Sequence, residues 1–145
     1  MSTIYINTDG GSRGNPGPAG IGVVFYDKNE EEIHACHEFI GEATNNQSEY
    51  KAIILALEVL TKSKWMEKNN GDQEKKVICR LDSKLVVEQI NGNFKVKNEG
   101  IKPLISKVNK IKAKIEVPID FIHVPREKNA RADELANIAM DEGAK

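Results

Sequence analysis

The stretch IYINTDGGSRGNPGPAGIGVVFY, residues 4–26, sets the pattern from which the fold is predicted. Its first part, residues 4–8, alternates apolar and polar side chains as a half-buried strand does. Asp9 follows directly, and a loop rich in glycine and proline is expected at residues 10–20. The apolar run at residues 21–26 predicts a second strand, so the first strand ends on a carboxylate beside a glycine-rich loop.

The rest of the sequence predicts a third strand and then alternating helices and strands. Residues 33–40 continue an antiparallel meander after a polar turn. The strongest helical pattern begins at Thr44, which has the form of a capping box with Gln47, and continues to about residue 62. The later elements are expected as a solvated connection at 63–76, a strand at 77–81, helices at 83–90 and 101–114, a strand at 117–124 and a helix at 129–141.

These elements predict the fold class and the domain organisation. The order β-β-β-α-β-α-α-β-α indicates an α/β chain (α+β in its mixed sheet) with five strands covered by helices. With 145 residues, the chain is expected to form a single domain over 1–145 that buries a core without disulfides.

The composition narrows the class of protein further. A hydrophobic content of 39% with 30% charged residues is typical of a globular protein rather than a disordered one. Cys36 and Cys79 lie in strand-like runs and form no CxxC pair, so we expect two buried, reduced thiols. Since no apolar stretch approaches membrane-spanning length and no signal peptide is expected, the predicted location is the cytoplasm, without a membrane partner. No apolar stripe is left unexplained, so we expect a monomer without an obligate protein partner.

The net charge of -1 hides an uneven distribution along the chain. Residues 84–114 carry eight lysines against Glu88 and Glu99, a local balance of +6, whereas residues 27–58 have a balance of -6. A lysine-rich segment can follow a phosphate backbone even when the whole chain is nearly neutral, although such segments are also common as solvated helix faces. The charge pattern therefore supports a nucleic-acid partner without establishing one.

Four of the 22 acidic residues each lie at a predicted junction of strand, loop and helix. They are Asp9, Glu49, Asp82 and Asp133. Taken singly, Asp9 could be a turn residue, and Glu49 and Asp133 could be acids that favour a helix start. Carboxylates gathered in one pocket repel one another unless cations neutralise them, and oxygen-only sites suit hard ions such as Mg²⁺ or Mn²⁺. Together, the four predict a metal-dependent enzyme that acts on phosphates.

The local sequences around these acids carry a family resemblance. They read TDGGSRGNPGPAG at 8–20, TNNQSEY at 44–50, Asp82 followed by Ser83, and NARAD at 129–133. The chain resembles type 1 ribonuclease H over nearly its full length. The resemblance lies in these motifs, in their order along the chain and in the predicted order of strands and helices.

The resemblance implies endonucleolytic cutting of the RNA strand of an RNA–DNA hybrid, which leaves a 3′-hydroxyl and a 5′-phosphate. Asp9, Glu49, Asp82 and Asp133 would then be the catalytic residues and the ligands of two Mg²⁺ ions, with Asp9 bridging them at a separation of about 4 Å and Mn²⁺ as a possible substitute. One ion would lower the pKa of an attacking water on the side of Asp133. The other, beside Glu49 and Asp82, would neutralise charge on the leaving 3′-oxygen.

Residues near the four acids are expected to contact the hybrid. Glycine allows a sugar-phosphate chain to approach closely, and side-chain amides at a helix start can donate to base edges or phosphates. By resemblance, Asn15 and Thr44 grip a phosphate of the DNA strand, Glu49 contacts the RNA 2′-hydroxyl, and Phe94 packs on the DNA strand unless it belongs to the core. The predicted substrate-binding residues are Gly10, Gly11, Ser12, Arg13, Asn15, Thr44, Asn45, Asn46, Ser83, Phe94 and Asn129.

The chain departs from the family pattern at two places. Many relatives carry a histidine in the loop before the last helix, but residues 124–129 contain none, so Glu127 or Asn129 could replace it. The segment 91–101 is also short and lacks the lysine-rich protrusion of some relatives. We therefore expect slower turnover and weaker, salt-sensitive binding to which Lys95, Lys97 and Lys102 contribute in part.

Two alternatives remain open at this stage. The chain could be a hybrid-binding module of the same fold without catalysis, although clustered carboxylates without metal are costly to fold. It could also be another nuclease of the ribonuclease H-like fold that acts on DNA.

Overall fold

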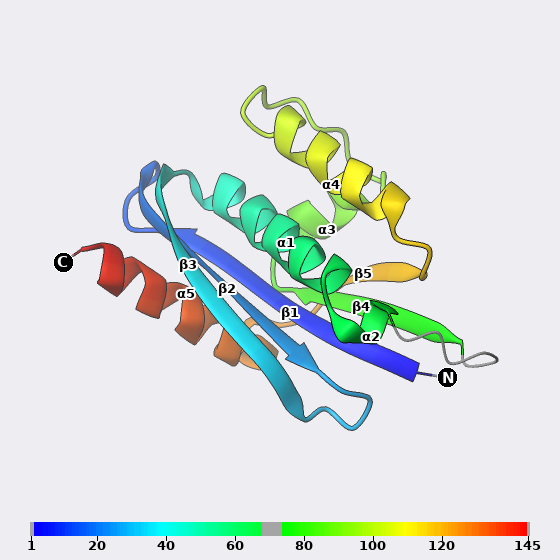
Figure 1. Ribbon diagram of the computed structural model, residues 1–145. Helices are drawn as coiled ribbons and strands as arrows, with labels where there is room; N and C mark the ends of the chain where they lie inside the picture. The colour runs from blue at the N-terminus through cyan, green and yellow to red at the C-terminus, as the bar shows by residue number, and fades with distance from the viewer. Residues whose placement is uncertain (1, 68–73, 145) are drawn as a thin grey trace.

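Figure 1 shows the arrangement of the elements in a computed structural model that describes residues 2–67 and 74–144. The strands are β1 (Ser2–Ser12), β2 (Gly17–Tyr26), β3 (Glu32–Ala43), β4 (Lys75–Leu81) and β5 (Ile119–His123). The helices are α1 (Asn45–Thr61), α2 (Lys64–Glu67), α3 (Lys84–Ile90), α4 (Lys102–Lys114) and α5 (Ala130–Gly143), with the short 3-10 helix η1 (Arg126–Lys128) before α5. No helix among the described residues has both the length and the apolar composition needed to cross a membrane.

The five strands form one mixed sheet in the order β3-β2-β1-β4-β5. The meander β1, β2 and β3 is antiparallel, whereas β4 pairs parallel to β1 and β5 pairs parallel to β4. The crossover from β3 to β4 contains α1, as a parallel connection requires. This sheet confirms the predicted fold class and element order.

Alternation along β2 shows how helices cover both faces of the sheet. Val23 belongs to the larger core cluster together with Ile53 and Leu57 of α1. The next residue, Val24, points to the opposite face and packs against Leu135 of α5. Helix α1 therefore lies on one face, with α4 packed on its outer side, and α5 lies on the other face (Figure 1).

The glycine-rich stretch at 10–20 is mostly strand rather than the expected loop. Gly10, Gly11 and Ser12 continue β1 and pair with residues 19–21 of β2, which leaves only residues 13–16 between the two strands. The glycines in this stretch allow other backbone segments to pack closely against the strands. Glycine is also common in turns, so the sequence alone could not distinguish the two uses.

Two smaller expectations also change. Part of the connection expected at 63–76 forms α2, β4 begins at Lys75, and residues 68–73 lie outside the described part. Both cysteines are free thiols, but only Cys79 is buried, whereas Cys36 is half-buried.

Glycines in β2 allow α5 to approach the sheet. A Cβ on Gly22 would lie 2.4 Å from the carbonyl oxygen of Ala132, and one on Gly20 would lie 2.6 Å from that of Ala136. Since these atoms belong to the helix backbone, a side chain at either position could be accommodated only by moving α5. The position of α5, which carries Asp133, therefore depends on the missing side chains in β2.

We expect Gly22→Ala to lower the free energy of unfolding by on the order of 1–3 kcal/mol, because the added methyl group pushes α5 away from the sheet. Urea unfolding followed by circular dichroism measures the change. Gly11→Ala is the matched control, because a Cβ there would meet its nearest atom, Met140 Cε, at an ordinary 3.7 Å. Equal stability of the two variants would contradict this account of α5 packing.

Candidate active site

Four carboxylates from four separate elements line one pocket of about 350 Å³. Asp9 lies within β1, Glu49 in the first turns of α1, Asp82 directly after β4, and Asp133 in the first turn of α5. For Asp9, Glu49 and Asp82, one carboxylate oxygen from each lies within 4.8 Å of the others. The described residues that line the pocket are Asp9, Gly10, Gly11, Asn45, Glu49, Asp82, Arg126, Asp133, Ala136 and Met140.

The contact between β1 and α1 brings Asp9 beside Glu49. A Cβ on Gly10 would lie only 2.3 Å from the carbonyl oxygen of Ser48, so only glycine permits this approach. The start of α1 is fixed by Thr44, whose Oγ1 accepts a hydrogen bond from the Gln47 amide at 3.1 Å. The Gln47 side chain in turn accepts from the Thr44 amide at 2.9 Å, which completes the predicted capping box.

Asp82 reaches the same place because β4 runs parallel to β1. Asn7 of β1 pairs with Arg80 of β4, so Asp9 and Asp82 each follow two residues later on neighbouring strands. The Asn129 amide Nδ2 then donates to the carbonyl oxygen of Thr8 at 2.9 Å and to Asp82 Oδ2 at 3.3 Å. Asn129 thus joins the start of α5 to both strands.

Asn129, which is expected to contact substrate, is buried in this structure. Its exposed fraction is 0%, so its side chain is reached only by protein groups. A buried amide that donates to Asp82 orients the carboxylate instead.

Burial and mutual repulsion raise the pKa values of the two innermost carboxyl groups. The pKa of Asp9 rises from 3.8 to about 7, first because the group is buried and next because Asp82 is close. Burial and the neighbouring Asp9 also raise the pKa of Glu49 well above its ordinary 4.5. Full ionisation of this cluster therefore requires a compensating positive charge.

The residues of the pocket fit a hard divalent cation. Glu49 Oε2 is buried and has no hydrogen-bond partner among the described residues, and it lies within the cluster of carboxylates. Unpartnered buried polar atoms are costly, and a cation would satisfy this one. The neighbouring acidic groups are all oxygen donors, as such ions prefer. Asp133 lies at the exposed side of the same pocket.

The turn between β1 and β2 is fastened to the first residues of α1. Asn45 Oδ1 accepts from the Ser12 amide at 3.0 Å, and Asn15 Oδ1 accepts from the Asn45 amide at 3.0 Å. Among the described residues, none accepts a hydrogen bond from Asn15 Nδ2, so this donor is left for another partner. Arg13, in contrast, is turned toward α5, where it pairs with Asp141 at 2.6 Å.

Three other predicted contact residues are not among the described residues that line the pocket. Asn46 is exposed in the first turn of α1, and Ser83 accepts from the Val86 amide at 3.3 Å as the N-cap of α3. Phe94 is 47% exposed, so the alternative that it belongs to the core is wrong.

Arg126 is a pocket residue that the sequence interpretation missed. The loop from β5 to α5 was expected to contribute Glu127 or Asn129, but among the described residues its contribution to the pocket is Arg126. A guanidinium beside these carboxylates can neutralise part of their charge, and its planar donors also suit a phosphate that enters the pocket. Arg126 and Lys128 are the two positively charged residues of this loop in the sequence. Which of their side chains faces the pocket depends on the path of η1, which the sequence does not reveal.

The chain is similar to a known protein family and to several curated relatives. Residues 7–139 match the family described as Reverse transcriptase-like. The chain is 40% identical over 142 residues to the bifunctional protein Rv2228c of Mycobacterium tuberculosis, covering 97% of this chain and 36% of that protein. It therefore spans about a third of the length of the mycobacterial relatives it matches. A ribonuclease H of Hahella chejuensis is 33% identical over 150 residues, covering 98% of this chain and 96% of the relative.

A solved structure extends the similarity to three dimensions. The crystal structure of LC11-RNase H1 in complex with an RNA/DNA hybrid aligns with a TM-score of 0.86 and 46% sequence identity. The alignment covers 98% of this chain and 99% of that chain. The likeness thus includes every element that carries one of the four carboxylates.

The raised pKa values predict an unusual pH dependence of stability for the metal-free protein. Between the unfolded pKa of 3.8 and the folded pKa of about 7, the unfolded chain has released the proton that Asp9 still holds in the folded state. Stability therefore falls as the pH rises through this window. Urea unfolding in EDTA from pH 5 to 8 should show this fall, and saturating Mg²⁺ should reverse it near pH 7.

Asp9→Asn should flatten the same pH profile, because the neutral amide holds no titrating proton. Asp120→Asn, which removes an exposed carboxylate from the surface pair with Lys76, is the matched control and should keep the profile of the original protein. A profile that rises from pH 5 to 8, or one that Asp9→Asn leaves unchanged, would contradict the account.

Proposed function

The chain belongs to the type 1 ribonuclease H family, and from this premise and the carboxylate pocket we propose that it is an endonuclease that hydrolyses the RNA strand of RNA–DNA hybrids. The products would carry a 3′-hydroxyl and a 5′-phosphate. The observation that supports the proposal most is the cluster of Asp9, Glu49 and Asp82, with Asp133 on the same pocket.

The proposal assigns Mg²⁺ to this pocket, with Mn²⁺ as a substitute and the four carboxylates as the ligands. When bound, two such ions would supply a water of lowered pKa and would compensate the negative charge on the leaving 3′-oxygen. The chain itself presents the buried Glu49 Oε2 to the pocket and keeps Asp82 in one orientation through Asn129. The proposal assigns the attacking water to the side of Asp133, which is exposed at the start of α5 and lines the pocket.

The residues around the turn between β1 and β2 would grip the hybrid. Asn15 Oδ1 accepts from the Asn45 amide, and the Thr44 hydroxyl accepts from the Gln47 amide. Within the described part of the chain, neither the Asn15 Nδ2 group nor the Thr44 hydroxyl proton is donated to another residue. Two fixed donors near the N-terminus of α1 suit a phosphate of the DNA strand. Asn46 and Phe94 are exposed and would contact base edges and the DNA strand, respectively.

Recognition of RNA requires a group that contacts the 2′-hydroxyl. Glu49 is assigned this contact in addition to its metal ligation, because it lies where β1 and α1 meet in the pocket. Gly10 and Gly11 line the same pocket without side chains, so a sugar could approach the backbone there.

The proposal also includes the setting expected from the sequence. We place the protein in the reducing cytoplasm, in keeping with the free thiols of Cys36 and Cys79, and we treat it as a monomer that needs no protein partner.

A strand-resolved cleavage assay tests the proposed function. With Mg²⁺ and a hybrid labelled separately on each strand, we expect cutting of the RNA strand alone, and none of duplex DNA or duplex RNA. EDTA should abolish it, and Asp9→Asn should lower the rate by more than about 100-fold because the substitution removes a metal ligand. Asp120→Asn should cut at the original rate.

Other outcomes of this assay favour the competing functions. Tight binding of the hybrid without cutting, in either Mg²⁺ or Mn²⁺, would identify a binding module. Cutting of duplex DNA would identify another nuclease of the same fold.

Arg126 is expected to contact the phosphate at which cutting occurs, because it is the cation on the rim of the carboxylate pocket. Arg126→Ala should lower kcat by about 10-fold or more, and Arg126→Lys should lose less because it retains the charge. Steady-state kinetics on the hybrid measures both. Arg131→Ala is the control, since Arg131 pairs with Glu32 and Glu134 away from the pocket. An effect of Arg126→Ala no larger than that of Arg131→Ala would show that Arg126 does not contact the reacting phosphate.

A further inference from the structure

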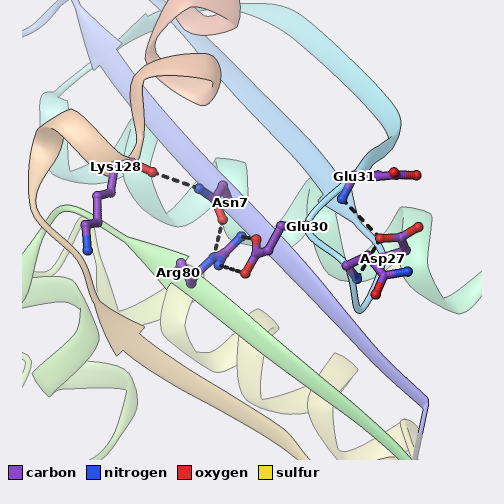
Figure 2. A network of polar contacts seen from close by, with 7 residues as sticks. Asn7, Asp27, Glu30, Glu31, Arg80 and Lys128 are labelled. Atoms are coloured by element: carbon purple, nitrogen blue, oxygen red, sulfur yellow. Dashed lines mark hydrogen bonds and ion pairs between the residues drawn. The ribbon is translucent and has the colours of Figure 1, made fainter.

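A polar network around Arg80 joins four segments that are distant in the sequence (Figure 2). Arg80 of β4 is its centre, with an exposed side-chain fraction of only 16%. Its Nε donates to Asn7 Oδ1 at 2.6 Å, and its two terminal nitrogens donate to the two oxygens of Glu30 at 2.8 Å each. The guanidinium also lies 4.4 Å from the ring centre of Tyr5 and 5.4 Å from that of Tyr26. Arg80 is thus held on several sides in one position.

Arg80 determines which way the Asn7 amide faces. The Nε–H group can only donate, so the atom of Asn7 that faces it must be the acceptor Oδ1. The donor Nδ2 is then turned to the other side, where it donates to the carbonyl oxygen of Lys128 at 3.3 Å. If the amide were reversed, Oδ1 would face that carbonyl oxygen and the two would repel.

The carbonyl of Lys128 belongs to the loop that enters the pocket. This loop is held at three points: the Val124 amide donates to Leu81, Lys128 accepts from Asn7, and Asn129 donates to Thr8 and Asp82. Arg126 lies between the first and second of these points. The side chain of Asn7 in β1 donates to the backbone of the loop, and the side chain of Asn129 at the end of the loop donates to the backbone of β1.

The turn that supplies Glu30 is itself built in an unusual conformation. Glu30 has a φ of 64°, in the left-handed region that costs a non-glycine residue on the order of 1 kcal/mol. Asp27 stabilises the turn by accepting from the amides of Asn29 and Glu31 through Oδ1 (Figure 2). A glycine would relieve the strain at this position but would remove the carboxylate that pairs with Arg80, which indicates a use for the side chain.

We propose that Asn7 and Arg80 are positioning residues that fix the loop between β5 and α5, so that Arg126 faces the carboxylate pocket and Asn129 orients Asp82. The expected effect on kcat rests on the proposed nuclease function. The expected position of the loop does not depend on that function. Neither residue is among those that line the carboxylate pocket, so each acts through the loop rather than on substrate.

Arg80→Met tests the proposal, because methionine keeps packing against the tyrosines and removes the donor that orients Asn7. Asn7→Leu removes the contact with Lys128 directly. Lys76→Met is the matched control, since it removes another cation of β4. Lys76 pairs with Asp120 at 2.9 Å and, among the described residues, forms no ion pair or hydrogen bond with the loop. We expect Arg80→Met and Asn7→Leu to lower kcat about 10-fold with KM changed less than about twofold, and Lys76→Met to change neither.

A double-mutant cycle with Arg126→Ala separates positioning from a general loss of stability. Because Arg80 acts on Arg126 through the loop, Arg80→Met should lower kcat by a smaller factor once Arg126 is already alanine, and the loss that remains comes through Asn129 and Asp82. Full additivity of the two losses would overturn the proposal.

Amide hydrogen exchange of residues 124–130 tests the structural part without any activity. Exchange there should be faster in Arg80→Met and Asn7→Leu than in the original protein, and unchanged in Lys76→Met. Unchanged exchange in Arg80→Met would overturn the proposal even if kcat fell. If the original protein cuts no hybrid, the proposed function fails, and the exchange result alone decides whether the loop is positioned in this way.

Discussion

Repulsion among buried carboxylates is the constraint around which this structure is arranged. Asp9 and Glu49 lie largely out of water and beside Asp82, and this raises the pKa of both groups. Such a cluster does not form spontaneously on a flexible chain, so the surrounding backbone must hold it. Gly10 provides the closest part of that support, because β1 and α1 touch there without an intervening side chain. The core on both faces of the sheet then supplies the stability that offsets the cost of the cluster.

Hydrogen bonds between distant segments complete the geometry that packing begins. Asn129 connects the start of α5 to β1 and to Asp82, and the pair of Asn7 and Arg80 holds the preceding loop from the other side. Each of these buried amides has a defined orientation, because its partners leave only one donor or acceptor choice. The pocket is therefore rigid where carboxylates must remain close, and it is open at Asp133 and Arg126, where a substrate could enter.

Much of the fold could be predicted from the sequence, because it is encoded in local periodicity. The meander, the capping box at Thr44 and the alternation that follows all depend on residues close in the chain. The stretch 10–20 was wrongly predicted as a loop. Its glycines allow a neighbouring helix to approach the strands, but glycine also permits a turn, and the sequence does not distinguish the two. The burial of Asn129 and the direction of Arg126 depend on contacts with Thr8, Asn7 and Asp82, which lie far away in the sequence, so no local pattern revealed them.

A crystal structure with Mn²⁺ would show whether the four carboxylates form a site for divalent cations. Anomalous scattering locates Mn²⁺ independently of any assumption about activity. The account predicts strong anomalous density within bonding distance of Asp9, Glu49, Asp82 and Asp133, and none in crystals of Asp9→Asn at the shared position. An empty pocket at saturating Mn²⁺ in the original protein would contradict this metal site and would leave the unpartnered Glu49 oxygen without an explanation.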